Sequence, residues 1–230
     1  MKNFKIILLL NFLFLFVNKN YAQTINWANL KSEQKHIVNL NVGGWDYAFV
    51  FGVGYGYKIN TKLPIILNAE YSFPSGKDLI DDFKTKIGGK IHIYQINNFQ
   101  FSANIYGVFR RYENPLVRLV NFGSDVTGIV GYYKSEWFVA GEVGFDKAIV
   151  THFKHSEVFK NTIYSGVKDG WYEPATGGNF YYGLQAGSSF KQIDLTFKIG
   201  KVITQDFKTT PLIPYYAQLG FNYKINGHKD

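Results

Sequence analysis

Apolar side chains return at every second position of this chain, in about ten separate stretches between residues 36 and 225. Residues 99–110 show the pattern clearly: phenylalanine, alanine, isoleucine and glycine occupy the odd positions, and mostly polar residues occupy the even ones. Successive side chains of a β-strand point to opposite faces, so each stretch has one apolar face and one polar face. The pattern predicts an all-β fold built from antiparallel strands.

Ten strands are predicted, at residues 36–45, 48–58, 63–73, 84–96, 99–112, 122–133, 137–149, 180–190, 193–203 and 215–225. The count becomes eight if the first strand or another is miscounted. Tight turns follow the second, fourth, sixth and eighth strands, whereas loops follow the third, fifth, seventh and ninth. The longest loop spans residues 151–179. Short turns on one side and longer loops on the other are typical of outer-membrane β-barrels, so the sequence predicts a closed up-and-down antiparallel transmembrane barrel.

Residues 1–22 have the pattern of a secretory signal peptide, because Lys2 and Lys5 precede an apolar run at residues 6–17 and Ala22 offers a cleavage site. That run is too short to span a bilayer. We expect residues 23–35 to form an N-terminal periplasmic segment and residues 36–230 to form the barrel. For residues 23–35 two alternatives remain: Trp27 docks on the barrel, or the whole segment trails.

The composition excludes several classes. The chain has no cysteine, which rules out a lipid-anchored lipoprotein and a disulfide framework. Removal of Lys2, Lys5 and Lys19 with the leader lowers the formal charge of +8 to +5. The remaining basic residues are spread along strands and turns, whereas a nucleic-acid-binding protein needs a basic stripe. We therefore expect no nucleic-acid partner.

The apolar face carries aromatic residues at both ends of the strands and aliphatic residues between them. The aromatic residues are Tyr57, Phe99, Trp137, Phe190 and Tyr223 beside the tight turns, and Phe49, Phe73, Phe109, Phe145 and Phe180 toward the loops; the aliphatic ones are Val53, Leu67, Ile105, Val143, Leu184 and Leu219. Two aromatic belts around an aliphatic band are expected where a barrel faces lipid. The alternative is a soluble exported barrel in which these rings line an apolar ligand cavity.

The polar face carries charges of both signs. We expect Glu70, Lys86, Lys90, Arg110, Glu142, Asp194, Lys198 and Lys224 to form a charge network in the lumen, together with Lys58, His92, Asp125 and Asp146. Buried charges are tolerated only when they are paired. The hairpin register places Glu70 beside Lys86 or Lys90, and Asp194 near Lys224. A ten-stranded barrel is narrow enough for side chains to fill it, so the lumen should be mostly plugged.

Residues 218–225, within the last predicted strand, resemble the terminal signal of outer-membrane barrels. This segment has a polar residue at Gln218, a glycine at Gly220, an aromatic residue at Tyr223 and a hydrophobic residue at Ile225. It departs from the pattern because it ends on isoleucine rather than phenylalanine and five more residues follow. The resemblance implies a small porin-like barrel of a Gram-negative-type outer membrane, with the barrel-assembly machinery as a transient partner and outer-membrane lipid as its surroundings.

Two motifs have residue types found in barrel enzymes. Asp81-Asp82 has the paired aspartates of omptin-type barrel proteases, but no Asp-x-His follows. His155-Ser156-Glu157 has the residue types of lipid-modifying barrels, and His152 lies three residues before it, a spacing that suits two metal ligands on one helical turn. Adjacent residues on a flexible loop rarely form a catalytic triad, so we favour a solvated loop. We assign no catalytic residue, cofactor or metal site and predict that the chain is not an enzyme.

Three functions remain open. The favoured one is a structural or binding protein with a plugged lumen, whose loop of residues 151–179 meets an extracellular ligand or protein through Tyr164, Trp171 and Tyr172. The second is a narrow pore for small solutes, which Lys86, Lys90 and Arg110 would bias toward anions. The third is a lipid-modifying enzyme built around His155 and Ser156.

Overall fold

A computed structural model describes residues 24–45, 48–59, 61–75, 82–174 and 177–227. Within these residues the chain forms eleven strands and two short helical turns. The strands are β1 (Gln34–Trp45), β2 (Ala48–Ile59), β3 (Ile65–Pro74), β4 (Asp82–Ile96), β5 (Phe99–Glu113), β6 (Val117–Tyr133), β7 (Trp137–His155), β8 (Gly170–Tyr172), β9 (Gly178–Phe190), β10 (Ile193–Thr204) and β11 (Tyr215–Asn226); the turns are η1 (Trp27–Asn29) and η2 (Phe159–Ile163). The predicted signal peptide lies outside the described residues.

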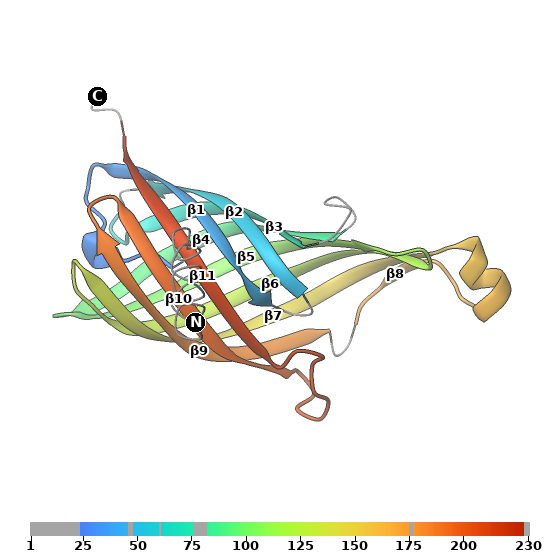
Figure 1. Ribbon diagram of the computed structural model, residues 1–230. Helices are drawn as coiled ribbons and strands as arrows, with labels where there is room; N and C mark the ends of the chain where they lie inside the picture. Colours follow the sequence, from blue (N-terminus) through green and yellow to red (C-terminus); the bar gives the residue numbers. More distant parts are fainter. Residues whose placement is uncertain (1–23, 46–47, 60, 76–81, 175–176, 228–230) are drawn as a thin grey trace, which may run out of the picture.

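Ten of the strands close into a barrel (Figure 1). Each pairs antiparallel with its neighbours, and the seam is closed by β1 and β11, where Leu40 lies opposite Phe221. The remaining strand, β8, pairs with β7 and extends the sheet outside the closed ring. The predicted closed up-and-down barrel of ten strands is confirmed, and the eight-stranded alternative is wrong.

Two strands are longer than the sequence predicted. β6 begins at Val117 rather than at residue 122, and β7 continues to His155 rather than ending at residue 149. A bulge in the β6–β7 ladder is the reason: Phe122 pairs with Val150 and Gly123 with Ala148, so one residue of β7 is unopposed. A bulge shifts the alternation by one residue, so the alternating pattern of the sequence breaks at this point. Figure 1 shows both strands reaching beyond the rest of the barrel.

The longest predicted loop, residues 151–179, is therefore largely structured in its described residues 151–174 and 177–179. It contains the end of β7, the turn η2 and the strand β8. Among the described residues, no helix is long and apolar enough to cross a bilayer.

The apolar face of the sheet points outward. Ile105 is 51% exposed and Leu184 is 62% exposed, whereas Glu142 is 4% exposed. A barrel with an apolar interior would show the opposite distribution. The alternative of a barrel enclosing an apolar cavity with its charges in solvent is therefore wrong.

Aromatic rings form a continuous belt around much of the loop-side end. Neighbouring ring centroids lie 5.1–6.1 Å apart along the series Phe49, Phe51, Phe73, Tyr71, Phe83, Phe109, Phe122 and Trp171. At the tight-turn end, Tyr132 contacts both Phe99 and Trp137. The predicted aromatic ends of the strands thus carry more rings than the sequence analysis assigned.

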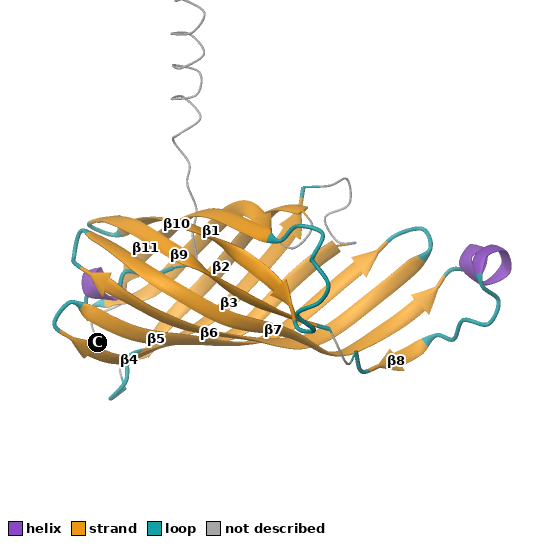
Figure 2. Ribbon diagram, turned by 90° about the horizontal axis from the view of Figure 1, so that it is seen from below, coloured by secondary structure: helices purple, strands orange, loops and turns teal. Residues whose placement is uncertain are grey.

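The N-terminal segment lies at the tight-turn end of the barrel. Its turn η1 and the loop-side turn η2 occupy opposite ends of the molecule, as Figure 2 shows. Ile25 packs against Ile37 of β1 and Ile66 of β3, and Trp27 and Leu30 pack against the same cluster. Of the two alternatives for residues 23–35, docking of Trp27 is correct for the described residues 24–35.

Candidate functional site

Ion pairs occupy the lumen along most of its length. Nearest the tight turns, the Lys224 ammonium lies 2.7 Å from the Asp194 carboxylate. In the middle, Lys198 lies 2.8 Å from Glu142, and Lys90 lies 3.5 Å from Glu70. Toward the loops, Lys86 pairs with Asp125, and both Lys84 and Arg110 pair with Asp146. All eight residues of the expected charge network therefore face the lumen and lie in ion pairs.

The pairing of Glu70 illustrates how the register alone left the choice open. Lys86 is the residue opposite Glu70 across the β3–β4 ladder. The Lys86 side chain nevertheless bonds Asp125 on β6, and Glu70 pairs diagonally with Lys90. Glu70 and Asp125 thus pair with different ammonium groups, those of Lys90 and Lys86.

Several polar residues that the sequence analysis did not assign support these carboxylates. Tyr216 donates to Glu142 Oε1 over 2.7 Å, and Gln185 donates to Glu142 Oε2 over 2.6 Å. Tyr181 donates to Asp125 Oδ1 over 2.6 Å. A signal was present in the sequence, because these side chains fall on the lumen-facing positions of the alternation. Their size and partly apolar character hid it.

The N-terminal segment closes the tight-turn end of the lumen. We call residues 24–31 the plug. The Asn26 side chain, fully buried, donates to Ser189 Oγ over 2.9 Å and to the Lys134 carbonyl over 2.8 Å. Asn222 donates to the Thr24 carbonyl, and Lys224 donates to Asn29 Oδ1. These contacts hold the plug on several strands at once.

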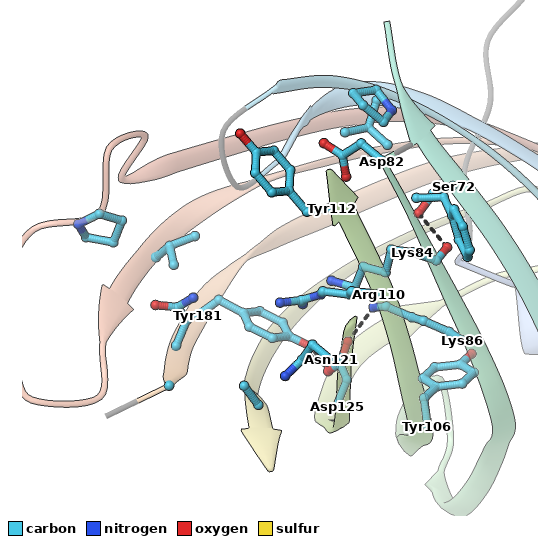
Figure 3. Close-up of a pocket in the computed structure, with 18 of the residues that line it drawn as sticks. Ser72, Asp82, Lys84, Lys86, Tyr106, Arg110, Tyr112, Asn121, Asp125 and Tyr181 are labelled. Atoms are coloured by element: carbon cyan, nitrogen blue, oxygen red, sulfur yellow. Dashed lines mark hydrogen bonds and ion pairs between the residues drawn. The ribbon is translucent and has the colours of Figure 1, made fainter. Parts of the chain in front are cut away.

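Above the plug, the loop-side half of the lumen holds a cavity of about 860 Å³, which we call the vestibule. Its cationic side chains inside the barrel wall are Lys84, Lys86, Lys90, Arg110 and Lys198. Figure 3 shows the Lys84, Lys86 and Arg110 side chains converging in this space, with Tyr106 beside Lys86 and Tyr112 nearer the rim. At the rim, Asp82 and Arg111 add one charge of each sign.

The loop beyond β7 has its own polar cluster. Asp169 Oδ1 accepts from the His155 backbone N–H over 2.8 Å and lies 2.9 Å from His155 Nδ1, while Asp169 Oδ2 accepts from Lys160 over 2.9 Å. The His155 backbone N–H, followed by the Lys160 ammonium, holds the pKa of Asp169 well below its ordinary value. This cluster ties the two ends of the loop together.

The residues of the candidate chemical motifs contact other parts of the loop and of β7. Ser156 Oγ accepts from the Phe159 backbone N–H over 3.1 Å. His152 and His155 belong to β7, so the helical turn assumed for a shared metal is wrong; the His152 ring instead contacts Trp171. In the part of the chain that the structure describes, no three metal-ligating side chains gather. Asp82 begins β4, and Asp81 lies outside the described residues.

Comparisons with known proteins give no family and no relative. No model of a known protein family matches the chain, and no curated protein matches its sequence. Arguments about function therefore rest on the barrel itself.

Proposed function

We propose that this chain is an integral protein of a bacterial outer membrane, plugged at its periplasmic end and open at its extracellular end, with a binding rather than a conducting role. The outward face supports the membrane placement. Its middle carries exposed aliphatic side chains such as Ile105 and Leu184, and aromatic rings lie toward both ends. Such a surface suits hydrocarbon flanked by two lipid headgroup layers.

The orientation follows from the connections. Outer-membrane barrels have short turns toward the periplasm and longer loops toward the exterior. The turns at residues 97–98 and 191–192 lie at the plugged end, and the loop of residues 156–174 lies at the other. The plug thus faces the periplasm, and the vestibule opens outward.

Export and assembly complete this proposal. Residues 1–22 would direct the chain across the inner membrane. The assembly-signal-like residues Gln218, Gly220, Tyr223 and Ile225 lie on β11, which closes the barrel against β1. Tyr223 and Ile225 point outward, where the barrel-assembly machinery would meet them.

The observation that carries the binding role is the plug. Its hydrogen bonds reach Lys134 in the β6–β7 turn, Ser189 on β9 and Asn222 on β11. A lumen sealed in this way at one end, with an open cavity at the other, favours retention of a ligand over passage of a solute.

Two measurements test the proposal. The expressed full-length chain should fractionate with outer membranes and migrate differently before and after heating, whereas recovery in the soluble periplasm would contradict the membrane placement. In planar bilayers the purified barrel should give no stable conductance steps. Steps that change on Arg110→Gln would instead support the narrow anion-biased pore.

A further inference from the structure

We infer that the vestibule binds a short neutral saccharide. The sugar hydroxyls meet Asn41 and Tyr106 inside the barrel, and the ring faces pack against Tyr112 and Phe153 at the mouth. All four residues line the cavity. This inference deepens the proposed binding role and rests on it for one point only, namely that the mouth opens to the exterior.

The deep lysines of the vestibule each lie in an ion pair with a carboxylate. The pairs are Lys86 with Asp125, Lys90 with Glu70 and Lys198 with Glu142. A charged ligand would have to separate one of these pairs, which would leave a buried charge without its partner. A hydroxyl group both donates and accepts hydrogen bonds, so it can contact an ammonium or a carboxylate while the pair stays intact. The floor of the cavity therefore favours an uncharged molecule that carries hydroxyls.

Two buried side chains in the cavity wall lack hydrogen-bond partners. Asn41 and Tyr106 are 4% and 5% exposed, and within the described residues the Asn41 side-chain nitrogen and the Tyr106 hydroxyl have no partner. Asn41 belongs to β1 and Tyr106 to β5, and strands β2, β3 and β4 lie between them in the ring. A buried polar group without a partner costs free energy. A ligand with several hydroxyls can reach both walls and remove that cost.

A residue of the next strand flanks each of these two groups. A Cβ atom at Gly52 of β2 would lie 2.4 Å from the Asn41 side-chain nitrogen, so glycine at this position leaves the amide its place. On the other wall, the Lys86 ammonium of β4 lies 5.7 Å from the centre of the Tyr106 ring (Figure 3). The neighbouring strands thus position both groups before a ligand arrives.

The mouth carries an aromatic wall. Tyr112 of β5, Leu119 of β6 and Phe153 of β7 are cross-strand neighbours, and all three line the cavity. The Tyr172 ring of β8 packs edge-on against Phe153, with the ring centres 5.5 Å apart. The face of an aromatic ring is negatively polarised and attracts C–H groups. Because a pyranose ring presents C–H groups on its faces and hydroxyls around its edge, it matches both the wall and the polar groups deeper inside.

The size of the vestibule agrees with such a ligand. Its volume of about 860 Å³ falls in the range of about 300–1,000 Å³ for small-molecule sites. The plug holds the tight-turn end through Asn26, so a ligand enters through the mouth. It passes Tyr112 near the rim before it reaches Tyr106 (Figure 3).

The test uses the full-length barrel in phosphatidylcholine nanodiscs with two neutral probes, maltotriose and triacetylchitotriose. We expect saturation transfer from the barrel to at least one of them, rising with sugar concentration to a plateau that empty nanodiscs do not give. Chitotriose, which is cationic, and trigalacturonate, which is anionic, should compete poorly. Sorbitol, which has hydroxyls but no ring, should also compete poorly. Equal competition by a charged sugar would overturn the neutral assignment, and equal competition by sorbitol would overturn the role of the aromatic wall.

One variant tests the deep contact. Tyr106→Phe removes a hydroxyl that has no partner among the described residues. The barrel should stay as stable as before, while the sugar binds about 10-fold more weakly because one hydrogen bond is lost. Tyr133→Phe changes a buried tyrosine that does not line the vestibule and should leave binding unchanged. Equal effects of the two variants would overturn the assigned role of Tyr106.

A pair of glycine variants tests the second deep contact. Gly52→Ala removes no polar group, but its Cβ would displace the Asn41 amide, so we expect binding to weaken about 10-fold. Gly128→Ala is the matched control, because a Cβ at this exposed glycine of β6 would lie 4.0 Å from its nearest neighbour. Heat-modifiability verifies that both variants are inserted. Equal sugar binding by the two variants would show that Asn41 is not a contact.

A third variant tests the mouth. Tyr112→Leu keeps an apolar side chain but removes the ring face, and we expect the sugar to bind about 5-fold more weakly. The control is Tyr94→Leu, at an exposed tyrosine of β4 near the tight turns. If both variants bound the sugar as tightly as the unmodified barrel, the ligand would not stack on the wall.

The outcomes separate this inference from the proposed function. A chain that inserts and is heat-modifiable but gives no saturable signal with either neutral probe would overturn this inference alone. A chain that does not insert would overturn the proposed function, and with it the outward-facing site.

Discussion

The Lys224 ammonium and the Asp194 carboxylate lie 2.7 Å apart with both side chains fully enclosed. The pair joins β11 to β10 and also reaches the plug, since Asp194 accepts from the Asn26 backbone N–H over 3.4 Å and Lys224 donates to Asn29. One ion pair thus connects the closing strand, its neighbour and the segment that seals the lumen.

Breaking this pair should destabilise the barrel strongly. Lys224→Met leaves the Asp194 carboxylate enclosed without its counter-charge, and we expect a loss of about 3–5 kcal/mol in the free energy of unfolding. Urea titration of the barrel in lipid vesicles measures it. The double variant Asp194→Leu with Lys224→Met buries no charge and should lose less than the single variant. An equal or larger loss would show that packing, not charge, dominates here.

Charges placed on the outward face should reveal depth in the proposed membrane. Leu184 and Phe190 are both exposed on β9, Leu184 in the middle and Phe190 beside the tight turn. Leu184→Arg should cost about 2–4 kcal/mol of stability, and Phe190→Arg about 0–1 kcal/mol. Refolding into vesicles, followed by urea titration, gives both values. Equal and small costs would be the result for a barrel surrounded by water.

Replacing the side-chain amide of Asn26 by a carboxylate should loosen the plug. Asn26→Asp replaces the amide that donates to Ser189 and Lys134 by a carboxylate, close to the Asp194 carboxylate. The plug residues Thr24, Ile25 and Trp27 line a small cavity that shares Lys90 and Asn104 with the vestibule, so the plug lies between the vestibule and the tight-turn end. We expect conductance steps in planar bilayers that the unmodified chain lacks. Asn161→Asp in the exposed turn η2 is the control, and steps in that variant too would argue against plug release.

The loop cluster around Asp169 should resist acid. Since the pKa of Asp169 is lowered in the folded loop, its contribution to loop stability is complete above about pH 4, the ordinary value for aspartate. It should be lost only as the pH falls further, through the lowered pKa. A spin label on Asn161→Cys, in a chain without other cysteines, should stay immobile from pH 7 to pH 4 and gain mobility below.

The matched variant for this measurement is Asp169→Asn. Its loop should already be mobile at pH 7, and the difference from the unmodified chain should shrink in strong acid. If the label were equally immobile in both chains at pH 7, the cluster would not be what holds the loop.

The strand count and the two faces of the sheet were predictable because each strand shows its alternation locally. The bulge opposite Phe122 and Gly123 was not, since one extra residue reverses the alternation and resembles the end of a strand. The eight expected lumen charges could be placed because each falls on a polar position of the alternation in its strand. The choice of partner for Glu70 depended on Asp125 attracting Lys86 from another strand, which no local pattern records.

The plug lay beyond sequence reasoning for a different reason. Asn26 reaches Ser189 across 163 positions of the chain, and the segment around Asn26 has no alternation to indicate what it contacts. The same holds for two buried side chains that line the vestibule. Tyr106 and Asn41 could be placed on the lumen face, but only the assembled wall shows that they face a cavity and have no partner among the described residues.

Because the plug continues directly into β1, it is tethered within a few residues of the opening that it closes. A short tether keeps a released segment at an effective concentration in the millimolar range around its own binding site. Any escape would therefore be followed by rapid recapture, and a dissolved competitor would have to reach a similar concentration to keep the passage open. The plug should therefore close the lumen again after each release, because it stays attached to the barrel.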